Sequence, residues 1–207
     1  MPKNIIPNVY EFENFYNEKD LEIILSKFKE NKKWDQIVQD RPGHYSHVFQ
    51  NDALSMPDEG ESYSASFSKN LELVDDAFIR DKTKEAIRKN LADHFNVDDF
   101  SIDLRCHKFE KNDYFRIHTD SYLASYALTI SLNKNWKWDW GRILSIAYGE
   151  KFSKLISLLP KWNSANLLSN DIEASPHFVT SIREFALEAR YNITCFIKSK
   201  KIEIISL

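Results

Sequence analysis

Glycine is scarce in this chain: its 207 residues include only four, at positions 43, 60, 141 and 149. Nucleotide-binding loops of the GxGxxG and GxxxxGKS/T kinds need clustered glycines, because their backbone must approach the phosphates closely. The sequence therefore excludes both of these common nucleotide-binding loops.

Cysteines and long apolar runs are also few. The two cysteines, Cys106 and Cys195, lie in apolar, strand-like segments and show no CxxC spacing, so we expect buried structural thiols in a reducing compartment. Residues 1–7 have no apolar segment of a signal peptide, and no apolar run approaches the ~20 residues of a membrane span. We therefore expect a soluble cytoplasmic protein that does not contact a membrane.

An excess of one charge is absent as well. The formal net charge is −3 and the isoelectric point is near 6.1, so no nucleic-acid partner is expected. Hydrophobic residues make up 43% and aromatic residues 14% of the chain, which is enough to fill a core. A chain of this length predicts one domain, with room for an N-terminal extension. Its oligomeric state is not predicted.

The N-terminal part shows helical periodicity. Apolar residues spaced at i, i+3, i+4 and i+7 predict a helix over residues 17–30, with Asn17 as its N-cap. A second helix is predicted over residues 81–95, beginning at Asp81. Residues 40–66 contain prolines and glycines among polar residues and predict loops.

The period changes to two after residue 97. Phe100, Ile102, Leu104 and Cys106 alternate with polar neighbours, which predicts a strand. Further strands are predicted over residues 126–132, 143–148, 163–168, 177–182 and 190–198. The pattern predicts an α+β fold whose strands close into a sandwich or jelly roll. Residues 1–96 would form a helical and loop part that packs on a core of residues 97–207, as one integrated domain.

Three residues in this core are candidate metal ligands. His118 and Asp120, at i and i+2 in extended backbone, point to one face and can reach the same ion. His177 follows Pro176, which favours extended backbone before it. Taken singly, each histidine also fits an ordinary surface or packed residue. Two imidazoles and one carboxylate together suit Fe(II), because they leave metal positions open for a chelating co-substrate and O2.

The last predicted strand has two different faces. Tyr191, Ile193, Cys195 and Ile197 form an apolar face and predict core, so the face with Arg190 and Thr194 borders solvent or a polar cavity. An arginine offers a permanently charged fork for a carboxylate. At ~3.3 Å per residue, Arg190 and Thr194 lie ~13 Å apart and do not share one carboxylate.

The order of these motifs resembles the Fe(II)/2-oxoglutarate-dependent oxygenases, specifically their prolyl-4-hydroxylase-like branch. That family shows an HxD motif, a distal histidine in a PHxV-like strand and a basic residue about a dozen positions later. Here the motifs are His118-Thr119-Asp120, Pro176-His177-Phe178-Val179 and, thirteen residues after His177, Arg190. The resemblance extends from about Leu104 to Ile197, about half of the chain.

The resemblance implies a double-stranded β-helix (jelly-roll) fold with Fe(II) held by His118, Asp120 and His177. It also implies that 2-oxoglutarate binds Arg190, with Thr194 and Ser131 as further cofactor-binding positions. O2 would oxidise the co-substrate to succinate and CO2 while a C–H bond of the substrate is hydroxylated. The branch points to a prolyl residue in a protein or peptide. A free amino acid or small metabolite is the alternative.

Several positions depart from the family pattern. A tyrosine that touches the co-substrate in many relatives is Phe109 here, and the glycine usual three residues later is Asn112. Ser131 replaces another tyrosine, and Gly141-Arg142 replaces a Gly-Gly pair. We interpret Arg142 as a solvated residue. These departures leave the metal ligands intact but change the expected contacts to the co-substrate.

Other features favour structural interpretations. Trp136, Trp138 and Trp140 are predicted to pack against the barrel, and His44 with His47 lacks a third metal ligand nearby. Cys106 and His107 are adjacent on a strand, so their side chains point apart and form no nucleophilic pair. The loops at residues 40–66 and 121–125 are candidates for a substrate lid.

Two other functions compete with an oxygenase. A non-catalytic jelly-roll binding protein would keep the fold, yet the complete set of three ligands and Arg190 argues against it. A metal-dependent hydrolase or isomerase of the cupin type would have no need for Arg190.

Overall fold

The computed structural model describes residues 2–39, 65–120, 123–170 and 176–199. The strands in these residues are β1 Lys3–Ile6, β2 Val9–Glu13, β3 Asp35–Gln39, β4 Ala65–Lys69, β5 Phe100–Phe109, β6 Tyr114–His118, β7 Tyr126–Ser131, β8 Leu144–Tyr148, β9 Lys154–Leu158, β10 Ser164–Ser169, β11 His177–Val179 and β12 Arg190–Ser199. The helices are α1 Glu18–Glu30, α2 Leu71–Asp75 and α3 Ala77–Leu91, with short 3-10 helices at Trp138–Trp140 and Glu150–Phe152.

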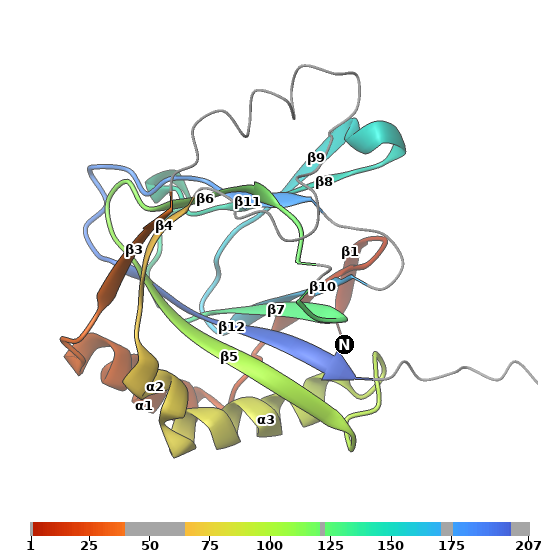
Figure 1. The fold of residues 1–207 in the computed structure, drawn as a ribbon, viewed down its shortest axis with the longest axis horizontal. Helices are drawn as coiled ribbons and strands as arrows, with labels where there is room; N and C mark the ends of the chain where they lie inside the picture. The colour runs from red at the N-terminus through yellow and green to blue at the C-terminus, as the bar shows by residue number, and fades with distance from the viewer. Residues whose placement is uncertain (1, 40–64, 121–122, 171–175, 200–207) are drawn as a thin grey trace, which may run out of the picture.

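The strands form one strongly curled sheet with two facing layers (Figure 1). Strands β10, β7, β12 and β5 lie side by side in the first layer, and β6, β11, β8 and β9 in the second. Every pairing among the described strands is antiparallel, and the chain crosses repeatedly from one layer to the other. This is the double-stranded β-helix, or jelly roll, that the family resemblance implies.

The N-terminal part contributes strands that the sequence did not predict. Strands β1 and β2 extend the first layer beside β10, and β4 joins the two layers by pairing with both β5 and β6. Strand β4 begins at Ala65, so the loop prediction over residues 40–66 is wrong for its last two residues; residues 40–64 lie outside the described residues. Strands from both sides of residue 96 thus share the sheet, and the proposed division of the chain there remains a prediction.

Helix α1 has the predicted position. The side chain of Asn17 accepts a hydrogen bond from the N–H of Lys19 at 3.0 Å, which makes it the N-cap. All four apolar positions that predicted this helix are buried. No helix in the described part of the chain is both long and apolar enough to cross a membrane.

Helix α3 begins and ends four residues before its predicted bounds. The cause is Asp76, whose carboxylate accepts a hydrogen bond from the N–H of Ile79 at 3.1 Å and caps the helix. The same carboxylate accepts a bond from Lys27 Nζ of helix α1 at 2.7 Å. Asp81, the predicted start, therefore lies inside the helix, and Phe95 is buried beyond its end.

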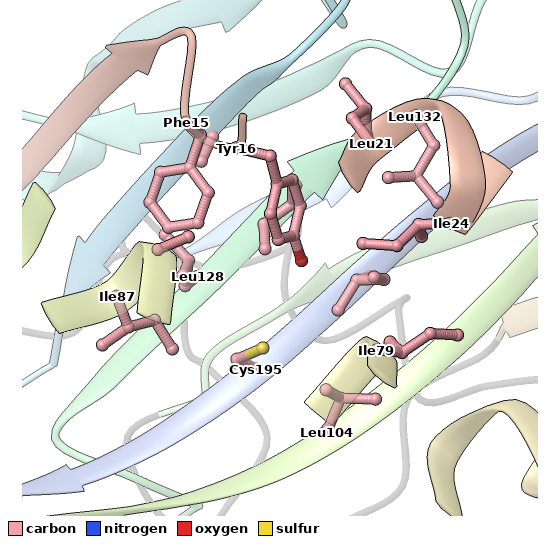
Figure 2. Close-up of a cluster of buried hydrophobic side chains, with 14 of the residues drawn as sticks. Phe15, Tyr16, Leu21, Ile24, Ile79, Ile87, Leu104, Leu128, Leu132 and Cys195 are labelled. Carbon is pink, nitrogen blue, oxygen red and sulfur yellow. The ribbon is translucent and has the colours of Figure 1, made fainter. Parts of the chain in front are cut away.

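The three helices cover the outer face of the first layer, where the main hydrophobic core lies (Figure 1). Figure 2 shows side chains from both sides of this core, among them Phe15 and Ile87 against Leu128 of β7 and Cys195 of β12. Cys106 and Cys195 are buried free thiols, and burial raises the pKa of both. The predicted structural role of the cysteines is confirmed.

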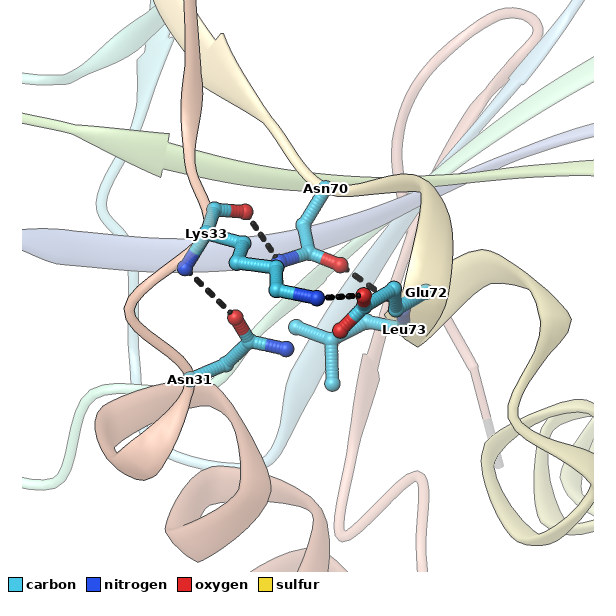
Figure 3. A network of polar contacts seen from close by, with 5 residues as sticks. All are labelled: Asn31, Lys33, Asn70, Glu72 and Leu73. Atoms are coloured by element: carbon cyan, nitrogen blue, oxygen red, sulfur yellow. Dashed lines mark hydrogen bonds and ion pairs between the residues drawn. The ribbon is translucent and has the colours of Figure 1, made fainter.

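A polar network connects the segment after α1 with the start of α2 (Figure 3). Asn31 accepts a hydrogen bond from the N–H of Lys33 at 2.8 Å. Asn70 accepts one from the N–H of Leu73 at 2.8 Å and donates to the carbonyl of Lys33. Lys33 also forms an ion pair with Glu72. The network joins the chain just before β3 to the chain just after β4, and so holds this pair of strands beside β5.

Candidate metal centre

Polar side chains line part of the inner face of the first layer. The register of β5 and β12 places Arg105 beside Thr194 and His107 beside Asn192, and the register of β12 and β7 places Ser131 beside Asn192. The intervening residues of these strands belong to the hydrophobic core, because side chains alternate across a strand. The polar face lines a cavity of about 430 Å³ between the two layers.

Three potential metal ligands meet in this cavity. His118 ends β6 and His177 begins β11, and the strand register places them opposite each other with ring centroids 4.2 Å apart. Asp120 lies with its carboxylate oxygens 3.4 Å from His177 Nε2 and 3.9 Å from His118 Nε2. The three ligand atoms lie within 4.8 Å of one another, and all three side chains are buried. The predicted group is thus brought together by a pairing of strands.

The hydrogen bonding of His118 determines which ring nitrogen faces Asp120. Its Nδ1 lies 2.7 Å from the carbonyl oxygen of Arg116, and because a carbonyl only accepts, Nδ1 carries the hydrogen. Nε2 then keeps its lone pair for a metal. Burial and the neighbouring His177 lower the pKa of His118 to about 4, so the ring is neutral at physiological pH.

The Asp120 carboxylate is ionised. Burial alone would raise its pKa, but the hydrogen bond and charge of His177 outweigh burial and hold the pKa below its usual range. A carboxylate and two imidazoles on one side of an ion leave its other side open. This donor set fits non-haem Fe(II), which needs open positions for further ligands.

Arg190 begins β12 and is 5% exposed. Its Nη2 donates to Ser131 Oγ at 2.8 Å and its Nη1 to the carbonyl of Arg142 at 2.9 Å. Its Nε is buried without a hydrogen-bond partner among the described residues. Burial lowers the pKa of Arg190 to about 9, and no carboxylate among the described residues forms an ion pair with its guanidinium. Arg190 and Ser131 together therefore offer an anion site.

Thr194 also lines the cavity, but at a different position along β12 from Arg190. It lies two positions beyond Asn192, whose side chain bonds Thr194 Oγ1 at 3.2 Å, and four beyond Arg190. Thr194 is thus separated from the Arg190 guanidinium along the strand, as predicted. Its placement among the cofactor-binding residues remains a prediction.

The interpretation of Arg142 as a solvated residue is wrong. Its side chain is only 4% exposed and lines the cavity, with its guanidinium carbon 3.1 Å from the ring centroid of Phe109. Gly141 before it has φ of 85°, and a Cβ there would clash with the carbonyl oxygen of Ser181. The N–H of Arg142 donates to the carbonyl of Thr180 at 3.2 Å, so a contact distant in sequence places Arg142 inside.

His107 was considered from the sequence only as a partner of Cys106, and its place in the cavity wall was missed. It is buried in the cavity wall, between the rings of Phe67 at 5.1 Å and Phe109 at 5.7 Å. The period-2 pattern contained a usable signal, because Leu104 and Cys106 predict core and their neighbours therefore face the other way. His107 and Cys106 do point apart, as predicted.

The tryptophans play different roles. Trp136 and Trp140 pack edge to face at 5.3 Å, and Trp140 joins a buried cluster with Ile182, so their predicted packing role is confirmed. Trp138 is 70% exposed and does not pack. His44 and His47, most of the loop at residues 40–66, and residues 121–122 lie outside the described residues.

No protein-family model matches the sequence, and no curated protein matches it. Solved structures do match. A prolyl hydroxylase from Trichoplax adhaerens, in complex with a peptide fragment of hypoxia inducible factor, has a TM-score of 0.61 and 12% identity over 93% of this chain and 84% of its own. The chain thus shares the fold of this hydroxylase.

Two further structures show the same double-stranded β-helix. A prolyl-4-hydroxylase from Pseudomonas putida has a TM-score of 0.55 and 11% identity, with 93% of each chain covered. The alpha-ketoglutarate-dependent epimerase SnoN from nogalamycin biosynthesis has a TM-score of 0.57 and 8% identity over 93% of this chain and 78% of its own. At these identities the likeness establishes the fold, and an activity must be argued from the cavity.

Proposed function

We propose that this protein is an Fe(II)- and 2-oxoglutarate-dependent dioxygenase that hydroxylates a C–H bond. The observation that carries the proposal is the presence of a buried His118–Asp120–His177 group and a buried Arg190 in the wall of one cavity. In the reaction, one oxygen atom of O2 enters the substrate as a hydroxyl group. The other enters succinate as 2-oxoglutarate loses CO2.

His118, Asp120 and His177 would hold the Fe(II) ion, and the ion supplies the oxygen chemistry when bound. The protein contributes a neutral His118 with its lone pair turned inward, an ionised Asp120 and a buried site that limits access of water. These groups are preorganised by the pairing of β6 with β11, so little rearrangement is needed for binding.

Arg190 would bind the distal carboxylate of 2-oxoglutarate. Its guanidinium is held in place by Ser131 and by the carbonyl of Arg142, and it is buried with a lowered pKa. A bound carboxylate supplies the negative charge that a buried cation needs. A hydrolase or isomerase of the cupin type would have no use for this residue.

For the substrate we propose a prolyl residue of a peptide or protein. Support comes from the prolyl hydroxylases among the similar structures, one of them bound to a peptide. A free amino acid or small metabolite is the second candidate, and the epimerase among these structures illustrates that the same fold carries other chemistry. Residues lining the described cavity fit either class.

Anaerobic reconstitution with Fe(II) tests the reaction class. Addition of 2-oxoglutarate is expected to produce the weak visible charge-transfer band of the chelate, and His177→Ala is expected to lose it. A protein that binds the metal but gives no band would contradict the proposal. A band without succinate release in a screen of prolyl peptides and amino acids would favour the non-catalytic binding protein.

A further inference from the structure

Arg142 adopts an unusual backbone conformation. Its φ is 58°, in the left-handed region that a side chain with a Cβ rarely adopts. A glycine would meet no such strain, and the pattern that this chain resembles has glycine here. Backbone strain of this kind persists where the surrounding structure enforces it, often at functional sites. The position therefore warrants a functional explanation.

The side chain of Arg142 lies in the cavity next to the Arg190 site. Its guanidinium carbon is 3.1 Å from the ring centroid of Phe109 and 5.1 Å from that of Phe115. Its own carbonyl accepts the bond from Arg190 Nη1 at 2.9 Å, so the two arginines are fixed to each other through the backbone. Phe109 stands where many members of the family that the sequence resembles have a tyrosine. The Arg142 guanidinium thus lies on the ring that lacks the tyrosine hydroxyl.

His107 lies on the same side of the cavity. It is 6% exposed, and its Nδ1 is buried without a hydrogen-bond partner in the part of the chain that the structure describes. Burial and then the charge of Arg142 lower the pKa of His107 to about 3, so the ring is neutral and can donate one hydrogen bond. A buried polar atom without a partner is costly unless a ligand or water supplies one.

We propose that Arg142 and His107 bind the 2-oxo-acid end of the co-substrate and replace the hydroxyl that Phe109 lacks. This inference rests on the proposed function. A 2-oxo acid that chelates a metal through its keto oxygen and one carboxylate oxygen retains another carboxylate oxygen, which needs a donor. Arg142 offers a charge-assisted hydrogen bond to that oxygen, and His107 offers a neutral one.

Two ligands distinguish binding of the 2-oxo-acid end of the co-substrate from binding of its distal carboxylate. 2-Oxoglutarate has both the 2-oxo acid and the distal carboxylate, whereas 2-oxopentanoate has the same carbon chain without the distal carboxylate. Binding of each is measured by calorimetry to the Mn(II)-loaded protein, which requires no turnover. Arg142→Gly is compatible with the φ of 58°, and Arg142→Met keeps the contact with Phe109 but removes the charge.

Arg142→Gly and Arg142→Met are each expected to lower the affinity for both acids by a similar factor, roughly tenfold to a hundredfold. His107→Phe, which fits among the surrounding aromatic rings, is expected to weaken both by a smaller factor. Arg190→Met is expected to lower the affinity for 2-oxoglutarate alone, down to the affinity for 2-oxopentanoate.

Arg105→Met is the matched control. Arg105 also lines the cavity, but its guanidinium bonds Asp103 at 3.0 Å, so removal of its charge is expected to weaken the binding of both acids much less than removal of the Arg142 charge. If Arg105→Met lowers both affinities as much as the Arg142 variants do, the effect comes from the overall charge of the cavity, and the inference is overturned. Unchanged binding of both acids to the Arg142 variants would overturn it as well. If the wild-type protein binds Mn(II) but neither acid, the proposed function itself fails.

Discussion

At the scale of single residues, Arg190 illustrates how hydrogen bonds fix the orientation of a buried charged group. Its guanidinium donates to two acceptors outside β12, the side chain of Ser131 and the carbonyl of Arg142, and has little freedom to turn. A charged group held in this way presents its remaining N–H groups in one direction. The proposed binding of a dicarboxylic co-substrate would therefore depend on the residues that hold Arg190 as much as on Arg190.

Ser131→Ala tests this dependence. The substitution removes the acceptor for Arg190 Nη2, so the affinity for 2-oxoglutarate is expected to fall by about 1 kcal/mol, roughly fivefold. Binding of 2-oxopentanoate is expected to stay the same, because that acid has no distal carboxylate. Ser131→Thr keeps the hydroxyl and serves as the control in the same calorimetric titration. A parallel loss for both acids would show that Ser131 acts on another part of the ligand.

Individual site residues were predictable from sequence to different degrees. His118, Asp120 and His177 were found because strand phase and motif order agreed, and the structure brings them together. Arg142 was misplaced because its burial comes from a contact with Thr180, 38 positions away, which no local pattern contains. A turn residue with positive φ gives no periodic signal at all.

At the scale of elements, the start of α3 depends on one carboxylate. Asp76 caps the helix and pairs with Lys27, so Asp76→Ala is expected to lower the free energy of unfolding by about 1 kcal/mol or more. Burial would raise the Asp76 pKa, but the Lys27 and backbone hydrogen bonds hold it below normal. A lowered pKa in the folded state stabilises the fold above the unfolded value near 4, and that contribution disappears as the pH falls through the folded value.

Urea unfolding at several pH values provides the measurement. The difference between wild type and Asp76→Ala is expected to be largest near pH 7 and to shrink below about pH 4. Asn17→Ala, which removes the uncharged cap of α1, is the control whose effect should not change over this range. A difference for Asp76→Ala that stays constant down to pH 2 would contradict the role given to its charge.

Strands such as β5 and β12 were predictable because apolar and polar residues alternate along them, whereas β6 and β9 were not predicted. Strand β12 was predicted to within one residue, and β10 was displaced by one. Strands β1 to β4 were missed, since each has only four or five residues and so gives too short a pattern to recognise. Their pairing with β10, β5 and β6 makes them strands, and that information lies elsewhere in the chain.

At the scale of the whole molecule, a metal would connect strands that are distant in sequence. Its ligands come from β6, from the segment after it and from β11 in the second layer, so an ion that binds only the folded state stabilises the whole unit. Mn(II) at a hundredfold excess over its dissociation constant is expected to add about 2.7 kcal/mol to the free energy of unfolding.

Thermal unfolding with and without Mn(II) measures this gain. His177→Ala is expected to abolish the shift, whereas His107→Phe, a change of another buried cavity histidine outside the ligand group, is expected to keep it. A shift of the same size in His177→Ala would mean that Mn(II) binds elsewhere on the protein.

The pairing of His118 with His177 has a consequence for how preparations of this protein can be judged. A slip of β11 by one residue against β6 would turn His177 to the opposite face and leave the ion with an incomplete set of donors. The irregular register between His177 and Val179 marks one alignment as native. If iron binds as proposed, the fraction of molecules that take up one equivalent after refolding would count the chains whose strands have aligned correctly, independently of any knowledge of the substrate.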